Sequence, residues 1–163
     1  MTQLELLDRV GPAFVVSNSL GGPGGFLVED ARPELVVGLV QLEPIGPAFD
    51  TMFGPDTLQW GVAAVPMKFD PPATSPGDLS LDHHQPPAPG APATVLQNEP
   101  ARKLSNLAQV PIAVVSGEAS VFRFTDGPLV EFLQQAGCDA VHIELNNADV
   151  LAVVTNWLDA QLS

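Results

Sequence analysis

Short apolar runs alternate along the chain with longer stretches in which apolar residues recur at helical spacing. The runs are rich in Val, Ile and Leu with few polar residues between them, as is typical of strands covered on both faces. Four strands are predicted: Ala13–Ser17, Val36–Glu43, Pro111–Gly117 and Ala140–Leu145. Strands separated by amphipathic helices predict an α/β fold with a mostly parallel sheet and crossover helices.

Three helices are predicted between and after these strands: Gly21–Arg32, Pro128–Ala136 and Asp149–Gln161. The first stops before Pro33, because the residue before a proline disfavours helical geometry. The second is ended by Gly137, the residue type that most often follows a helix. The third carries apolar residues close to the i, i+3, i+4, i+7 spacing of an amphipathic helix.

Residues 44–100 have a different character, since most of the 17 prolines lie there. This stretch is predicted to be irregular, partly extended and able to lie over other parts of the fold. Long excursions of this kind in α/β domains often carry function. We therefore interpret 1–163 as one domain in which 45–105 form a Pro-rich excursion or lid.

Composition narrows the classes of partner. Six Lys and Arg against 19 Asp and Glu give a formal charge of −13, which disfavours nucleic acid and anionic membranes as partners. No apolar run approaches the roughly 20 residues that span a bilayer, and the first residues lack a secretory signal pattern. A cytoplasmic location is the default expectation. The single cysteine, Cys138, is expected to be a free, buried thiol.

The stretch FVVSNSLGGPGG, residues 14–25, combines a strand, a serine between small residues and a glycine-rich helix start. A strand that breaks into small-x-Ser-x-Gly before a helix is the pattern of a nucleophile elbow, which presents Ser19 above the sheet. Ser17 stands where the template has glycine. The side chains of Ser17 and Asn18 offer hydrogen bonds that could hold the Ser19 hydroxyl away from an attacking pose.

Five motifs in order extend this pattern: SNSLGG at 17–22, EDARPELV at 29–36, LEP at 42–44, the FDPP and EPARKL segments of the Pro-rich part, and SGEAS at 116–120. Together they resemble a bacterial and fungal esterase-like branch of the α/β-hydrolases, with elements of its second half only. The resemblance implies a partial α/β-hydrolase fold with the Pro-rich part as a lid-like insertion. It also implies a small ester or acyl substrate.

The resemblance assigns roles to particular residues. Ser19 matches the nucleophile and Glu43, after the second strand, matches the acid of the triad. The backbone N–H of Leu20 would be one oxyanion donor. Glu118 is an alternative acid; Asp126 is a third, unless it caps the helix before Pro128.

The catalytic base has no clear source in the sequence. In the resembled branch a histidine lies between the last strand and the last helix, but here that connection is Asn146-Asn147-Ala148. His142 lies inside the last predicted strand and is read as a packed residue. His83 and His84 are read as surface residues, a weak metal-binding pair or a substitute base; together with Asp82 they do not fill a zinc site. No cofactor or metal is expected.

Two interpretations follow. The first is a serine carboxylic-ester hydrolase by descent, whose isolated chain has low or no activity because the triad is incomplete. The second is a non-catalytic hydrolase-like binding or interaction module, or half of a split or longer hydrolase. In either case the first strand lacks a neighbour on one side, which predicts homo-oligomers or pairing with an N-terminal half.

Overall fold

The computed structural model describes residues 1–49, 57–86, 92–145 and 150–162. Its centre is a sheet of four parallel strands in the order β1 (Ala13–Asn18), β2 (Val36–Leu42), β7 (Ile112–Gly117) and β8 (Ala140–Leu145). Asn18 pairs with Leu42, and Leu42 pairs with Val115. The carboxyl ends of β1, β2 and β7 therefore meet at one edge of the sheet, and the predicted parallel α/β fold is confirmed.

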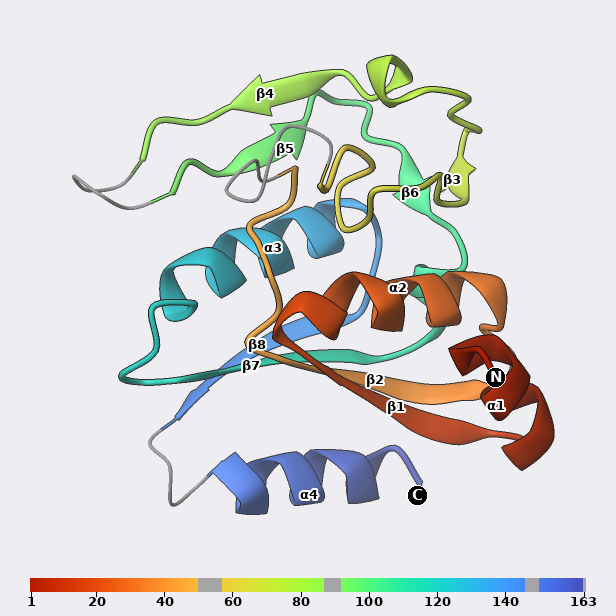
Figure 1. The fold of residues 1–163 in the computed structure, drawn as a ribbon. Coiled ribbons are helices and arrows are strands. Elements are labelled where there is room, and N and C mark those ends of the chain that lie inside the picture. Colours follow the sequence, from red (N-terminus) through yellow and green to blue (C-terminus); the bar gives the residue numbers. More distant parts are fainter. Residues whose placement is uncertain (50–56, 87–91, 146–149, 163) are drawn as a thin grey trace.

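Helices cover both faces of this sheet (Figure 1). The helices α2 (Gly22–Ala31) and α3 (Arg123–Gln135) lie on one face, and α4 (Val150–Ala160) lies on the other. Along β2, Leu39 packs in the core below α2 and α3, whereas Val40 packs in the cluster that includes Trp157 of α4. This alternation explains why the strand contains almost no polar positions.

Two helices differ from the sequence prediction. An additional helix, α1 (Gln3–Val10), precedes β1, and its first turn is closed by a capping box between Thr2 and Glu5. The T-x-x-E pattern was the available signal. Helix α3 starts at Arg123 rather than at Pro128, which lies inside it. Proline is tolerated there because the carbonyl that loses its partner belongs to the exposed residue Phe124 near the helix start.

The described parts of the Pro-rich excursion contain regular structure that the sequence prediction missed. Strand β3 (Phe69–Asp70) pairs with β6 (Lys103–Leu104), and β4 (Leu81–His83) pairs with β5 (Val95–Gln97), both antiparallel. In Figure 1 these strands lie beyond α2 and α3, on the side away from the sheet. Whether the excursion acts as a lid stays a prediction.

Hydrogen bonds and apolar contacts attach the excursion to both helices. On α2, Asp30 accepts from the Lys68 N–H (3.2 Å), and its carbonyl accepts from Asn106 Nδ2 (2.6 Å). On α3, Gln135 exchanges two hydrogen bonds with the backbone of Gln97 (2.8 and 2.7 Å). Buried side chains of the excursion, including Trp60, join the core formed by α2, α3 and the sheet.

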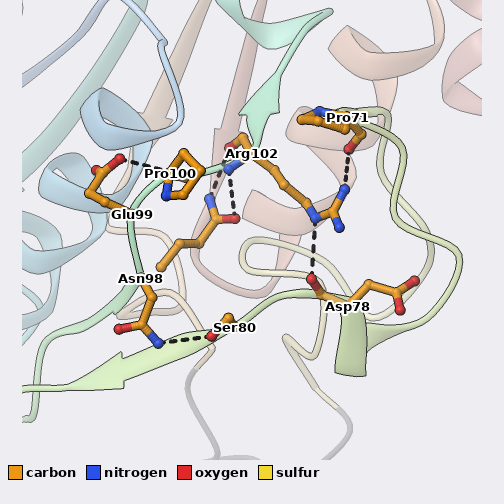
Figure 2. Close-up of a pocket in the computed structure, with 9 residues that line it drawn as sticks. Pro71, Asp78, Ser80, Asn98, Glu99, Pro100 and Arg102 are labelled. Carbon is orange, nitrogen blue, oxygen red and sulfur yellow. Dashed lines mark hydrogen bonds between the residues drawn. The ribbon is translucent and has the colours of Figure 1, made fainter.

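Arg102 ties together the turns of the excursion (Figure 2). Its guanidinium donates to the carbonyls of Pro71 (2.7 Å), Pro72 (2.9 Å) and Asp78 (3.2 Å). The Asp78 carboxylate accepts hydrogen bonds from the backbone and hydroxyl of Thr74 and from the backbone of Ser75. These donors lower the pKa of Asp78 to about 2. Pro71, Asp78 and Arg102 line part of a cavity of about 360 Å³, and the hydrogen bonds from Arg102 to the other two indicate that this part of the wall is braced.

Candidate active site at the serine elbow

Ser19 lies at a sharp strand-to-helix turn. Strand β1 ends at Asn18 in extended geometry, and Ser19 then adopts a φ of +51° before the chain turns into α2. A positive φ is uncommon for a residue other than glycine and marks local strain. The Ser19 carbonyl accepts hydrogen bonds from the N–H groups of Gly22 and Ile45, which fix the turn on both sides. This is the geometry of a nucleophile elbow.

Gln41 of β2 holds the elbow against the sheet. It is fully buried; its Oε1 accepts from Ser17 Oγ (2.8 Å) and its Nε2 donates to the carbonyl of Gly22 (3.0 Å). Helix α2 approaches β1 closely at this point: a Cβ added at Gly25 would lie 2.4 Å from Ser17 Oγ. Sequence reasoning missed Gln41, although one polar residue in an apolar strand was a usable signal.

The expected role of Ser17 and Asn18 is wrong. The Ser17 hydroxyl binds Gln41, and Asn18 Nδ2 donates to the carbonyl of Leu42 (2.9 Å). Both side chains therefore bind β2 rather than the serine. Within the described residues, the Ser19 hydroxyl makes no hydrogen bond, and the side chain is partly exposed.

Glu43 directly follows β2, the strand that pairs with β1 beside the elbow. Because Asn18 pairs with Leu42, Ser19 and Glu43 occupy equivalent positions at adjacent strand ends. Glu43 also has a positive φ, +46°, and its Oε1 accepts from the Gly117 N–H (3.2 Å) at the end of β7. The structure thus brings the predicted nucleophile and the predicted acid to the same edge of the sheet.

Leu20 and Glu118 are both exposed. Leu20 is 68% exposed, and its backbone N–H lies at the start of a helical turn, where no preceding turn supplies an acceptor. Such a donor is available to a bound oxyanion. The carbonyl of Glu118 accepts from the Arg123 guanidinium, whereas no hydrogen bond of the Glu118 carboxylate is found in the described residues.

The three histidines lie in different places. His83 is an exposed residue of β4, and His84 Nε2 lies 3.5 Å from Asp82 Oδ2, with both side chains exposed. Across the residues that the structure describes, neither forms a hydrogen bond with Ser19 or Glu43, and no group of three His, Cys, Asp or Glu side chains could hold a metal ion. The connection 146–148, where the base is missing from the sequence, lies outside the described residues.

The chain is similar in sequence to a protein named as a lipase and in fold to a solved lipase structure. No protein-family model matches the chain. A protein of Fungal sp. (strain ATCC 74256), "Probable secreted lipase phiG", is 37% identical over 177 residues, which cover 96% of this chain and 48% of that protein. The chain thus spans about half the length of this relative.

Two solved structures are similar to the chain in their backbone, to different degrees. A monoacylglycerol lipase of Paleococcus ferrophilus matches with a TM-score of 0.50 and 12% identity, over 97% of this chain and 74% of that one. The chain therefore has a partial α/β-hydrolase fold. A polyneuridine aldehyde esterase mutant gives a TM-score of 0.44 with 12% identity, over 98% of this chain and 75% of that one, which is too low to carry an argument.

Asp126, the third candidate acid, lies within electrostatic range of Glu43, but the alternative role as a helix cap is wrong. Asp126 does not cap a helix before Pro128; it is a fully buried residue in the first turn of α3, which begins at Arg123. Burial, together with the negative charge of Glu43, raises the pKa of Asp126 to about 7. Ser116 of β7 and Thr125 offer it hydroxyl donors, which lower the pKa in part.

His142 is a strand residue of the hydrolase sheet, as predicted. Its Nε2 lies 2.8 Å from Ser116 Oγ, and burial lowers the pKa of the imidazole.

Cys138, just before β8, is a free and buried thiol, which confirms the prediction made for this cysteine. Burial raises the pKa of this thiol to about 12, so it carries no thiolate chemistry at neutral pH.

Glu29 is a buried acid in the last turn of α2, away from the elbow. It is fully buried and, in the described structure, neither carboxylate oxygen has a hydrogen-bond partner. Burial, reinforced by the charge of Asp30, raises the pKa of Glu29 to about 9, so the side chain is a neutral acid at pH 7. Among the described residues, no helix is both long and apolar enough to cross a bilayer.

Proposed function

We propose that the chain carries the nucleophile and the acid of a serine carboxylic-ester hydrolase. The observation that supports this most strongly is the left-handed backbone of Ser19 at a strand-to-helix elbow, adjacent in register to Glu43. The names of the relatives, a lipase and a monoacylglycerol lipase, favour carboxylic esters as the substrate class.

In the proposed reaction Ser19 Oγ attacks the ester carbonyl carbon while its proton passes to a base. The Leu20 N–H donates to the oxyanion, and Glu43 orients the base. The base returns the proton to the alcohol as the ester C–O bond breaks, and water then hydrolyses the acyl-serine. The base and the second oxyanion donor are proposed to come from groups other than those identified at this edge.

An incomplete triad predicts a low rate for the isolated chain. Loss of the base typically lowers turnover on the order of 10⁴-fold or more, because the serine hydroxyl is then not activated. His83 and His84 are the substitute bases to test, since they lie on the excursion beyond α2 and α3.

The test is labelling with a fluorophosphonate probe, followed by mass spectrometry of the intact chain and its peptides. We expect slow labelling confined to Ser19 and abolished in Ser19→Ala. Ser17→Ala is the matched control, because Ser17 is bound to Gln41. Labelling at another serine would contradict the assignment of the nucleophile. Rapid labelling that disappears in His83→Gln or His84→Gln would contradict the low rate and identify the base.

A second candidate function, an interaction module, is favoured by the outer edge of β1. This strand pairs only with β2 in the described sheet, and Val16 is 58% exposed. Beside it, side chains of α1 and β1 line an apolar groove of about 290 Å³, including Leu6, Val10 and Phe14. We propose that this edge pairs with a strand from an N-terminal half or from a second copy of the chain.

Light scattering over a range of concentrations tests the edge. Association that is reduced in Val16→Lys but retained in Val65→Lys, an exposed valine of the excursion, is the expected result for a second copy. A monomer at micromolar concentrations with cooperative unfolding would contradict self-association through β1. Val65 controls for the general effect of a new surface charge.

A further inference from the structure

Gln41 is a fully buried amide side chain of β2 that contacts the chain on both sides of Ser19. Its Nε2 donates to the Gly22 carbonyl (3.0 Å) on the helix side, and its Oε1 accepts from Ser17 Oγ (2.8 Å) on the strand side. The Gly22 carbonyl can only accept, so Nε2 must face Gly22 and Oε1 must face Ser17. Both polar groups of the amide are therefore paired, and both partners belong to the segment that carries the proposed nucleophile.

The backbone of Ser19 needs support from outside the elbow. Its φ of +51° is unfavourable for serine, because the Cβ comes close to the following carbonyl oxygen. The Ser19 carbonyl accepts from the N–H groups of Gly22 and Ile45. Gln41 in turn binds Gly22 through its carbonyl, so a hydrogen-bonded path runs from the buried amide through Gly22 to the Ser19 carbonyl.

This path also sets the direction of the Leu20 N–H. Ser19 and Leu20 are joined by a trans peptide bond, in which the carbonyl and the N–H point in opposite directions. Because the Ser19 carbonyl faces the N–H groups of Gly22 and Ile45, the Leu20 N–H points away from them. A rotation of this peptide would therefore turn away the N–H group that is proposed as the oxyanion donor.

The start of α2 packs closely against Gln41. A Cβ added at Gly22 would lie 3.1 Å from Gln41 Oε1 and 2.8 Å from Pro44 Cβ. A Cβ added at Gly25, in the same turn of the helix, would lie 2.8 Å from Gln41 Nε2. Such close packing leaves the Gln41 side chain little room to change rotamer.

We propose that Gln41 is a positioning residue for the Ser19 nucleophile, and that it acts by holding Gly22 and, through Gly22, the peptide between Ser19 and Leu20. The catalytic meaning of this role rests on the proposed function. The effect on the backbone of Ser19 does not, because it follows from hydrogen bonds within the fold. Without the Gln41 amide, the Ser19 backbone is expected to relax toward negative φ.

The conformation of Ser19 is measured by NMR, through the NOE between its own amide and α protons. These two protons are closer at positive φ than at negative φ, so the parent chain should show a strong intraresidue NOE at Ser19. Methionine has a similar length to glutamine and no hydrogen-bond donor. In Gln41→Met the Ser19 NOE should therefore weaken to the level of ordinary strand and helix residues.

Gln97→Met is the matched control. Gln97 is also a buried strand residue, and its amide also donates to a backbone carbonyl (2.9 Å) and accepts from a backbone N–H (3.2 Å), both of Arg102 in the excursion. Its replacement should leave the Ser19 NOE strong. If Gln41 contributed only to stability, both variants would lower the free energy of unfolding and neither would change the NOE.

The same variants are then treated with the fluorophosphonate probe. Labelling of Ser19 should be about 10–100-fold slower in Gln41→Met than in the parent chain, because a small misplacement of reacting groups has an effect of this size. Gln97→Met should be labelled at the parent rate.

Gln41→Glu keeps the proposal testable if Gln41→Met does not fold. While it is protonated, the new carboxyl has an acceptor and a donor like the amide, so the Ser19 NOE should match that of the parent. Once ionised, as followed by its carbon-13 shift, it can no longer donate to the Gly22 carbonyl, and the NOE should weaken. A strong Ser19 NOE in Gln41→Met, or in folded Gln41→Glu with its carboxyl ionised, would overturn the proposal.

The two measurements separate this proposal from the proposed function. If the probe fails to label Ser19 in the parent while the NOE depends on Gln41, the proposed reaction fails and the effect on the backbone stands. If Ser19 is labelled and neither the rate nor the NOE changes in Gln41→Met, Gln41 has no positioning role and the proposed reaction stands.

Discussion

Replacing Glu29 with glutamine is expected to stabilise the folded chain by an amount that increases with pH. Glu29 is fully buried in α2 without a hydrogen-bond partner among the described residues, and its pKa rises from 4.5 to about 9 on folding. Between these two values the unfolded chain releases the proton while the folded chain keeps it. The free energy of unfolding therefore falls as the pH rises.

The size of the effect follows from the two pKa values. Each pH unit between 4.5 and 9 lowers the free energy of unfolding of the parent chain by about 1.4 kcal/mol. At pH 7 the accumulated loss is about 3 kcal/mol, a large part of the 5–15 kcal/mol that typically stabilises a domain. Glutamine has a similar shape and does not ionise, so Glu29→Gln lacks this pH dependence.

Urea denaturation followed by tryptophan fluorescence measures the difference between the two chains. From pH 5.5 to pH 8.5 the advantage of Glu29→Gln should grow by about 4 kcal/mol. Acids that titrate in both chains, such as Asp126, cancel in this difference. Glu131→Gln, an exposed position in α3, should give a flat difference. A Glu29→Gln advantage constant to within about 0.5 kcal/mol over this range would refute the reasoning.

The other stability predictions concern the elbow helix and the excursion. Gly25→Ala should lower the free energy of unfolding by about 1–3 kcal/mol, because the new Cβ would lie 2.4 Å from Ser17 Oγ. Gly24→Ala, which meets only the end of the Gln3 side chain at 3.1 Å, should be neutral or stabilising by up to about 1 kcal/mol in the same urea assay. Arg102→Lys should speed amide hydrogen exchange in the turns before β4 but not in β2, since lysine cannot reach three carbonyls with one planar group. Unchanged exchange in those turns would show that Arg102 does not brace them.

The central sheet could be predicted because its sequence signal is local. The predicted strand Val36–Glu43 and the observed β2, Val36–Leu42, differ by one residue. A strand buried on both faces needs a continuous apolar run, and the turns that flank such a strand favour glycine or proline. The elbow was predictable for the same reason, since the strand, serine and glycines are consecutive.

The polar environment of the site could not be predicted, because it joins residues distant in sequence. Ser116 and His142 are separated by 26 positions, and Glu43 and Gly117 by 74. Each of these residues has an ordinary local context. The start of α3 was predicted wrongly, and the cause is local. Pro128 suggested a helix start with Asp126 as a possible cap, whereas the helix begins at Arg123 and accommodates the proline in its second turn.

The left-handed backbone at Ser19 and Glu43 has a consequence for engineering this fold. An L-residue in that region loses on the order of 1–2 kcal/mol, whereas glycine adopts it freely. A library selected for thermal resistance alone would therefore enrich glycine at the two positions that carry the proposed chemistry. Stabilised variants of this chain should be sought with both positions held constant.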